Sequence, residues 1–204
     1  MKLLLRVLVV MPMIVAFGWA GTITLGIVPV SQTIPPAGSA SVDITISGLD
    51  AGVAPSLSVY DLSVSYNSSI LGFSSLAFGD SVLGDQLDLS GFGTITIVDS
   101  SVPGVIQFSE ISFDLPATLD SQQLDAFTLA TITFTGIGGG ISPLSLTVNS
   151  LGDSIGDPLT VDPANIGSGS VTVTGSTSIP EPATFIPVGV GLLLLGACRR
   201  RLVS

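Results

Sequence analysis

The residues of this chain that could take part in chemistry are almost all carboxylates. The chain has fifteen Asp and Glu residues, no His and one cysteine, Cys198. All five basic residues lie near the two ends of the chain: Lys2, Arg6, Arg199, Arg200 and Arg201. Residues 21–179 therefore contain no Lys, Arg or His. Because Ser-His-Asp and Cys-His sites need a basic partner, and typical zinc sites need His or Cys, this segment can form neither kind of site.

Carboxylates alone can still hydrolyse glycosidic bonds when two of them lie about 5 to 9.5 Å apart. Six acidic residues in the middle of the chain are candidates: Asp80, Asp85, Asp88, Asp99, Glu110 and Asp114. Aromatic platforms for sugars are scarce, since Trp19 is the only Trp, and Tyr60 and Tyr66 share the apolar phase of a predicted strand. A carboxylate-only polysaccharide hydrolase is therefore the alternative to a non-enzymatic protein, which is our main interpretation.

Two loops repeat the pair Gly-Asp in a way that suits calcium. One contains Gly79-Asp80 and Gly84-Asp85, and the other contains three acidic residues that we predict as calcium ligands: Asp153, Asp157 and Asp162. Ca²⁺ takes several oxygen ligands, and Gly permits the tight turns between them, although neither loop has EF-hand spacing. The competing interpretation is that Asp and Gly simply form soluble turns. No other cofactor is predicted.

The charge of the chain is strongly partitioned. Fourteen of the fifteen acidic residues lie within residues 21–179, where there is no basic residue to balance them. This segment cannot form a side-chain ion pair, and it is unsuited to nucleic acid because phosphate contacts depend largely on Lys and Arg. Anionic polysaccharides and anionic membranes are not expected as partners for the same reason, unless cations bridge the two surfaces.

Alternating apolar and polar residues predict that the acidic segment consists of β-strands. Typical runs are residues 42–46, 60–66 and 130–134, and Gly- and Pro-rich turns separate them. Residues 57–59 have the opposite phase to 60–66, which predicts a bulge near Tyr60. Only residues 121–127 are expected to form a helical turn. Many short strands without helices between them favour an all-β, antiparallel β-sandwich.

One part of this pattern resembles the cohesin family. The resemblance rests on residues 41–47 and on the run Leu62-Ser63-Val64-Ser65-Tyr66-Asn67-Ser68-Ser69-Ile70-Leu71-Gly72-Phe73, with further matches at 127–134 and 169–173. Asn67-Ser68 stands where the family usually has Asp-Pro. The resemblance covers residues 21–175 and implies a jelly-roll sandwich of about nine strands. Because cohesins bind dockerins through one sheet face, it also implies a dockerin-like partner, with calcium dependence as one option.

The N-terminal segment has the pattern of a secretory signal peptide. Lys2 and Arg6 give it a positive start, residues 3–17 are mostly apolar, and Gly18-Trp19-Ala20 places small residues at a cleavage site. We predict that residues 1–20 are removed after Ala20. An uncleaved N-terminal anchor is the alternative.

The C-terminal segment has the pattern of a short membrane anchor. After a linker at 176–179, Pro180, Glu181 and Pro182 precede an apolar run at 183–198, and Arg199, Arg200 and Arg201 follow at once. The run is shorter than the roughly 20 residues of a straight span, but Arg side chains can reach the headgroups and favour the cytoplasmic side. We predict a transmembrane segment at 183–198; the alternative is a buried apolar element of a soluble domain.

The three parts of residues 180–204, in this order, resemble the PEP-CTERM sorting signal. That signal is found on exported proteins of Gram-negative bacteria that make extracellular polysaccharide. The resemblance implies that an exosortase recognises Pro180, Glu181 and Pro182 and cuts nearby, while Arg199 to Arg201 act as the membrane stop.

From these signals we expect an exported protein. Its body would first be held in the periplasm by the inner membrane, and later reach the cell surface or extracellular matrix. There it would have a structural or adhesive role linked to exopolysaccharide or biofilm, with binding of a dockerin-like partner as the alternative role.

Overall fold

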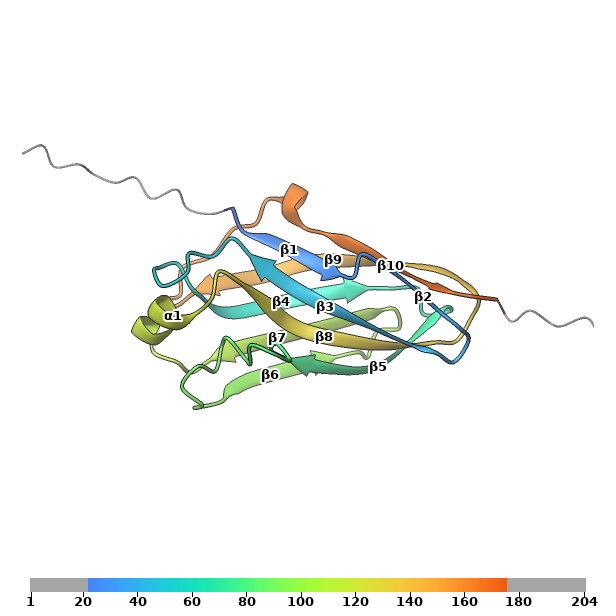
Figure 1. The fold of residues 1–204 in the computed structure, drawn as a ribbon, viewed down its shortest axis with the longest axis horizontal. Coiled ribbons are helices and arrows are strands. Elements are labelled where there is room, and N and C mark those ends of the chain that lie inside the picture. Colours follow the sequence, from blue (N-terminus) through green and yellow to red (C-terminus); the bar gives the residue numbers. More distant parts are fainter. Residues whose placement is uncertain (1–21, 176–204) are drawn as a thin grey trace, which may run out of the picture.

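The computed structural model describes residues 22–175, which form two β-sheets packed face to face (Figure 1). The four-stranded sheet contains, in order, β1 (Thr24–Val28), β3 (Ser39–Ser47), β8 (Ala126–Gly136) and β5 (Leu71–Phe78). The six-stranded sheet contains β2 (Ser31–Ile34), β10 (Ser168–Val173), β9 (Gly140–Asp153), β4 (Leu57–Ser65), β7 (Val105–Ser112) and β6 (Thr94–Asp99). The prediction of an all-β sandwich is confirmed.

The number of strands is ten among the described residues, rather than the predicted nine or so. The first two strands lie in different sheets: β1 ends at Val28 at the edge of the four-stranded sheet, and β2 begins at Ser31 at the edge of the six-stranded sheet. Pro29 lies at this crossing and has no N–H to offer to either ladder. The pairing of β2 with β10 is parallel, whereas every other strand pair in the two sheets is antiparallel.

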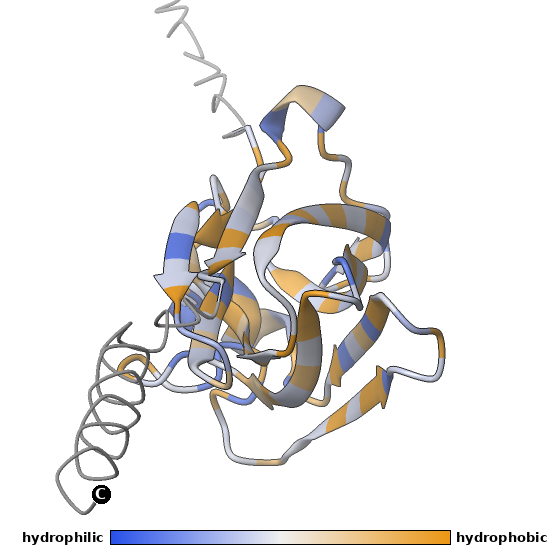
Figure 2. Ribbon diagram, turned by 90° about the vertical axis from the view of Figure 1, so that its right-hand side faces the viewer, coloured by the Kyte–Doolittle hydropathy of each residue, from blue (hydrophilic) through white to orange (hydrophobic). Residues whose placement is uncertain are grey.

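The core lies between the two sheets and is built from alternate residues of each strand. Figure 2 shows this alternation as bands of hydrophobic and hydrophilic residues along the ribbons. Central strands contribute side chains that are almost completely buried: Val42, Ile44, Ile46, Leu62, Val64, Ile106, Phe108, Ile132 and Phe134. Each such side chain contributes about 1.5–3 kcal/mol of transfer free energy, so the packing of the sheets drives folding.

Residues 22–175 form a self-contained folding unit, because both sheets and the core between them are complete within this range. The predicted signal peptide, linker and sorting segment lie outside the described residues. Within residues 22–175, the structure has no helix long and apolar enough to cross a membrane.

Two of the local irregularities lie on β4 or opposite it. The ladder between β4 and β9 skips Ser58, two residues before Tyr60, which confirms the predicted bulge. A second shift, on the β9 strand, leaves Asn149 without a partner between Val148 and Ser150. An extra residue at a bulge bends the strand and redirects its side chain.

The one α-helix of the described chain begins earlier than predicted. It is α1 (Pro116–Gln122), and residues 126–127 already belong to β8, so the prediction of a helical turn over 121–127 was wrong in its position. The signal that places the helix is Pro116, since proline fits the first turn of a helix and not a strand interior. The 3₁₀-helix η1 (Pro163–Asn165) also has proline at its start and is capped by Asp162.

The residue after α1 fixes this end of the sandwich. Gln123 is 3% exposed, and its side-chain amide pairs with both backbone groups of Leu57 at the start of β4. The Leu57 N–H donates to Gln123 Oε1 over 2.6 Å, and Gln123 Nε2 donates to the Leu57 carbonyl over 2.8 Å and to the Gln86 carbonyl over 3.0 Å. Three segments that are distant in sequence are thereby joined through one amide.

Replacing Gln123 with Ala is predicted to lower the free energy of unfolding by about 3 kcal/mol, because buried backbone groups would lose their partners. Urea denaturation of the sandwich measures this change. Gln122→Ala is the matched control, since Gln122 is the exposed last residue of the same helix. Equal stability of the two variants would contradict the role of Gln123.

Candidate functional site

The outer face of the six-stranded sheet carries exposed apolar side chains where β6 and β7 meet. Cross-strand pairing places Val59, Ile111 and Ile95 in one outward row over β4, β7 and β6. Ile97 lies in the next row on β6, opposite Ser109. Ile95, Ile97 and Ile111 are 45%, 58% and 42% exposed, so three large apolar side chains stand together on a surface that strand alternation would normally leave polar. These three isoleucines are called the apolar patch below.

A polar cluster lies beside the apolar patch on the same face. The Asp61 carboxylate accepts hydrogen bonds from Gln107 Nε2, at 3.0 Å to each oxygen, and from Asn149 Nδ2 at 3.0 Å. Asn149 also donates to the Ser63 hydroxyl over 2.9 Å, which its bulge position allows. The charge of Asp61 is thus held in place by amides from the strands on both sides of β4.

The outer face of the four-stranded sheet is different. Its outward residues are mainly Ser and Thr, and their hydroxyls pair across strands, as Ser41 does with Thr133 at 3.2 Å and Ser74 with Thr135 at 2.7 Å. Thr131 donates to the Asp43 carboxylate over 2.7 Å. This face has the polar character of a solvated surface, so the apolar patch distinguishes the six-stranded sheet as the candidate for binding another protein.

A buried carboxyl group lies between the sheets directly behind the apolar patch. Glu110 on β7 is 1% exposed and accepts hydrogen bonds from the Tyr60 hydroxyl (2.8 Å) and the Thr94 hydroxyl (2.7 Å). Burial is the main cause that raises the pKa of Glu110, from an ordinary 4.5 to about 7. The hydrogen bond from Thr94 opposes this rise in pKa, and a hydrogen bond shared with Asp85 adds to it. Burial, followed by the charge of Glu110, also raises the pKa of Tyr60, which keeps its phenol a donor.

Both tyrosines serve the core, as the sequence predicted. Tyr60 is fully buried and meets the Phe108 ring edge-on, with 6.1 Å between the ring centroids. The ring centroids of Tyr66 and Phe134 lie 5.1 Å apart. Neither ring forms an exposed platform of the kind on which a sugar stacks.

The carboxylates that could have formed a hydrolase site mostly shape a loop. Between β5 and β6, Asp80 accepts the N–H groups of Val82 and Leu83, and these bonds lower its pKa. The other loop contacts are similar: Asp85 with Leu87 N–H, Asp88 with Gly93 N–H, and Asp114 with the N–H groups of Leu89 and Ser90. Asp99 accepts the Ser101 N–H after β6. Asp85 and Glu110 share a hydrogen bond, but Glu110 is buried between the sheets rather than placed in an open cleft.

Two of the three predicted calcium ligands, Asp153 and Asp162, accept backbone hydrogen bonds through their carboxylates. Asp153 Oδ1 accepts the N–H groups of Ile155 (3.0 Å) and Asp157 (2.8 Å), and Asp162 accepts the N–H of Ala164 (2.8 Å) at the start of η1. Among the residues that the structure describes, no group of three or more His, Cys, Asp or Glu side chains could hold a metal ion. Calcium binding by this loop stays a prediction, and the contacts favour the competing interpretation of Asp as a turn former.

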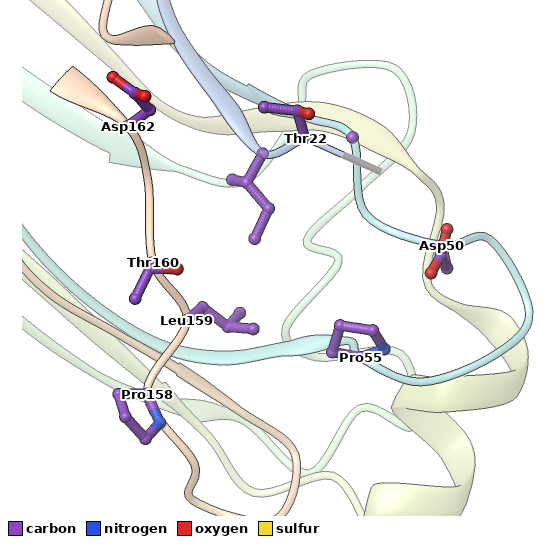
Figure 3. Close-up of a pocket in the computed structure, with 9 residues that line it drawn as sticks. Thr22, Asp50, Pro55, Pro158, Leu159, Thr160 and Asp162 are labelled. Atoms are coloured by element: carbon purple, nitrogen blue, oxygen red, sulfur yellow. The ribbon is translucent and has the colours of Figure 1, made fainter. Parts of the chain in front are cut away.

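A pocket of about 390 Å³ opens at the end of the sandwich where β1 begins (Figure 3). Apolar side chains of Ile23, Pro55 and Leu159 line it, and Asp50 and Asp162 lie on opposite sides of the opening. None of the six candidate hydrolase carboxylates lines this pocket. It is also separate from the apolar patch, which lies on other strands.

Comparison with known proteins identifies the fold. No protein-family model and no curated protein sequence matches the chain. Solved structures of cohesins do match the chain. A type I cohesin of Pseudobacteroides cellulosolvens is 15% identical with a TM-score of 0.57, and the match covers 78% of this chain and 97% of that one. The sandwich has the cohesin fold.

Two further structures show how broad this likeness is. A cohesin of Clostridium thermocellum, solved in a type I cohesin–dockerin complex, is 15% identical with a TM-score of 0.56, and the match covers 74% of this chain and 99% of that one. A non-cellulosomal cohesin of the archaeon Archaeoglobus fulgidus is 13% identical with a TM-score of 0.54, with coverage of 76% and 94%. The resemblance inferred from residues 41–73 is therefore confirmed for the fold of the cohesin-like domain.

The residues of the apolar patch were not identified as a site from the sequence. A signal was present, because the apolar phase changes between Phe108 and Ile111, and Ile95 and Ile97 alternate with threonines. Alternation indicates a strand but leaves open which of its faces is buried. The cross-strand pairing of β6 with β7 supplies that information.

The cohesin-like domain is predicted to lose stability as pH rises from about 4.5 to 7. In this window folded Glu110 keeps a proton that the unfolded chain has released, so the free energy of unfolding falls with pH. The stabilisation that protonated Glu110 gives to the folded state is fully present below pH 4.5 and is lost above about pH 7. Glu110→Gln imitates the protonated acid, so at pH 8 the variant should be more stable than wild type by roughly 2–3 kcal/mol.

Denaturation at several pH values measures this dependence. Asp125→Asn removes an exposed carboxylate and serves as the control that keeps the wild-type slope. A Glu110→Gln variant that loses stability with pH as steeply as the control would contradict the assignment.

Proposed function

We propose that the cohesin-like domain is a protein-binding module that docks a dockerin-like partner on the outer face of its six-stranded sheet. The observation that carries this proposal is the apolar patch, in which Ile95, Ile97 and Ile111 are exposed together on three neighbouring outward positions. Interfaces commonly combine such an apolar centre with a polar rim. The Asp61 cluster supplies ordered acceptors and donors at that rim.

One observation supports a dockerin-like partner in particular. Solved structures with the same fold include cohesins described as complexes with dockerins. The acidity of the domain adds one expectation about this partner, namely that its contacting surface carries Lys or Arg around an apolar centre. A non-enzymatic role agrees with the use of the carboxylates in loops and in the core.

Ile111→Asp is predicted to weaken partner binding about a hundredfold or more, because it places a charge in the middle of the apolar contact. Exported proteins of the host are captured on the immobilised domain, with calcium and with a chelator, and the captured protein is then purified. Its affinity for wild type and variants is measured by calorimetry.

Ile137→Asp is the matched control, since Ile137 is 60% exposed in the loop after β8 and lies outside the apolar patch. A partner that binds Ile111→Asp as tightly as Ile137→Asp would overturn the docking site. A loss of binding in chelator alone would assign calcium to the interaction.

We also propose that the domain acts outside the cytoplasm, at the cell surface or in an extracellular matrix. The support is the resemblance of residues 180–204 to a PEP-CTERM signal together with the signal-peptide pattern of residues 1–20. In this proposal an exosortase cuts near Pro180, Glu181 and Pro182, and the docked partner links the domain to a structural or adhesive assembly of the exopolysaccharide or biofilm.

Mass spectrometry of the protein recovered from a Gram-negative host that has an exosortase tests this processing. The mature chain is expected to begin at Gly21 and to lack the tail that contains Arg199 to Arg201. Combined replacement of Pro180, Glu181 and Pro182 by Ala should leave the tail attached, whereas Ser176→Ala in the linker should not. An intact tail on the mature wild-type protein would contradict the proposal.

A further inference from the structure

Strand β6 is an open edge of the six-stranded sheet. It pairs with β7 on one side only, and residues 95–99 are all exposed. Its sequence is Thr94-Ile95-Thr96-Ile97-Val98-Asp99, in which every residue except the last is β-branched. Such residues favour extended backbone, so β6 is a preformed strand with one unused side.

The free backbone groups of β6 can be identified from the ladder. In an antiparallel pair, residues that bond to one neighbour alternate with residues that face the other. Tyr66 donates its N–H to the Gly104 carbonyl over 2.8 Å, which shows that β4 is hydrogen-bonded to the even-numbered residues of β7. The odd-numbered residues of β7 therefore bond to β6, and the register pairs them with the odd-numbered residues of β6. The even-numbered residues of β6 therefore point N–H and C=O to the open edge: Thr94, Thr96 and Val98.

Natural sheets usually protect such an edge, and this molecule protects others. At β1, Gly167 donates its N–H to the Leu25 carbonyl over 2.7 Å, so the segment after η1 covers that edge. At β5, a bulge at Ser74 interrupts the ladder. Strand β6 has no bulge, proline or lysine, and within residues 22–175 no hydrogen bond outside the ladder uses its outward backbone groups.

We propose that β6 pairs antiparallel with β6 of a second copy of this chain, across a two-fold axis at Thr96. Residues that lie opposite each other in two paired strands must point to the same face of the sheet. When Thr96 lies opposite its own equivalent, every residue pair of the two β6 strands meets this condition. Ile95 then lies opposite the second copy's Ile97 on the outer face, and Thr94 lies opposite the second copy's Val98 on the other face. Thr96 meets its own equivalent, and all the outward backbone groups of residues 94–98 find partners.

Charge opposes a second copy at this edge, because both domains are acidic and the Gly93 N–H is bonded to the Asp88 carboxylate. Asp99 is the only charged residue of β6, and in this register it lies opposite the second copy's Gly93. The two Asp99 carboxylates are then about 20 Å apart along the strands, well beyond a Debye length of about 8 Å at physiological salt. Repulsion between the two acidic bodies remains, so the dimer should strengthen when salt is added.

The pairing would join two cohesin-like domains into one continuous twelve-stranded sheet. A two-fold axis perpendicular to the sheet leaves both outer faces on the same side, so the two apolar patches become neighbours. A dimer of this kind could engage a partner at two points, which raises the overall affinity through effective concentration. This inference goes beyond the proposed function, since a dimer can form whether or not a dockerin-like partner exists.

Sedimentation velocity of residues 22–175 over a range of concentrations tests the proposal. Wild type is expected to form a dimer that strengthens with added salt. Thr96→Pro removes an N–H that points to the open edge and spares the bonds to β7, so its dimer should be about tenfold weaker or more, with the sandwich still folded. Ile97→Lys should have the same effect, because it places a cation in the outer-face contact.

Val102→Lys is the matched control, since Val102 is 59% exposed in the turn after β6 and outside the proposed contact. It should dimerise like wild type. Circular dichroism of each variant separates a lost dimer from a lost fold. A wild-type protein that stays monomeric at high salt, or a dimer that survives Ile97→Lys and Thr96→Pro, would overturn the proposal. Open-ended oligomers would do so as well, because two-fold pairing closes on itself.

Discussion

The absence of any basic side chain from residues 21–179 is the constraint on which much of this structure depends. Fourteen carboxyl groups must be accommodated without a single ion pair, so each buried or half-buried one needs neutral donors or a proton. Loop carboxylates such as Asp80 and Asp114 meet this need with backbone N–H groups, and Asp61 meets it with the amides of Gln107 and Asn149. The loops and the outer face take their shape from the same requirement.

Glu110 is the case in which neutral donors are not enough. Its two hydroxyl donors come from different strands, Tyr60 on β4 and Thr94 on β6, so one carboxyl group ties the centre of the six-stranded sheet to its edge. Burial favours the protonated form, and Asp85 adds to this by sharing a hydrogen bond. A residue of β6 is therefore hydrogen-bonded to the buried group, directly behind the apolar patch, whose pKa is raised.

The sequence was sufficient for the class of fold and for the buried faces of the central strands, because runs such as Ile132 and Phe134 have one apolar phase and lie between two sheets. It was insufficient at the edge, where Ile95 and Ile97 have the same alternation but point to solvent. The side that is buried depends on which strand lies next to it, and that is non-local information. Non-local pairing also decides two polar contacts. Asn149 reaches Asp61 because a bulge on β9 faces β4, and Gln123 bonds to Leu57, which is distant in sequence.

The acidity of the domain and the unprotected edge of β6 are best understood together. Local protection of an edge, by lysine or proline, acts at the strand itself, whereas net charge acts on the whole molecule and is screened by salt. A domain that relies on net charge to limit association keeps the backbone groups of Thr94, Thr96 and Val98 available for pairing. Its association is then set by ionic strength and by the shape of the second strand. If β6 pairs as proposed, the net negative charge of the domain therefore opposes the same association that its open edge favours.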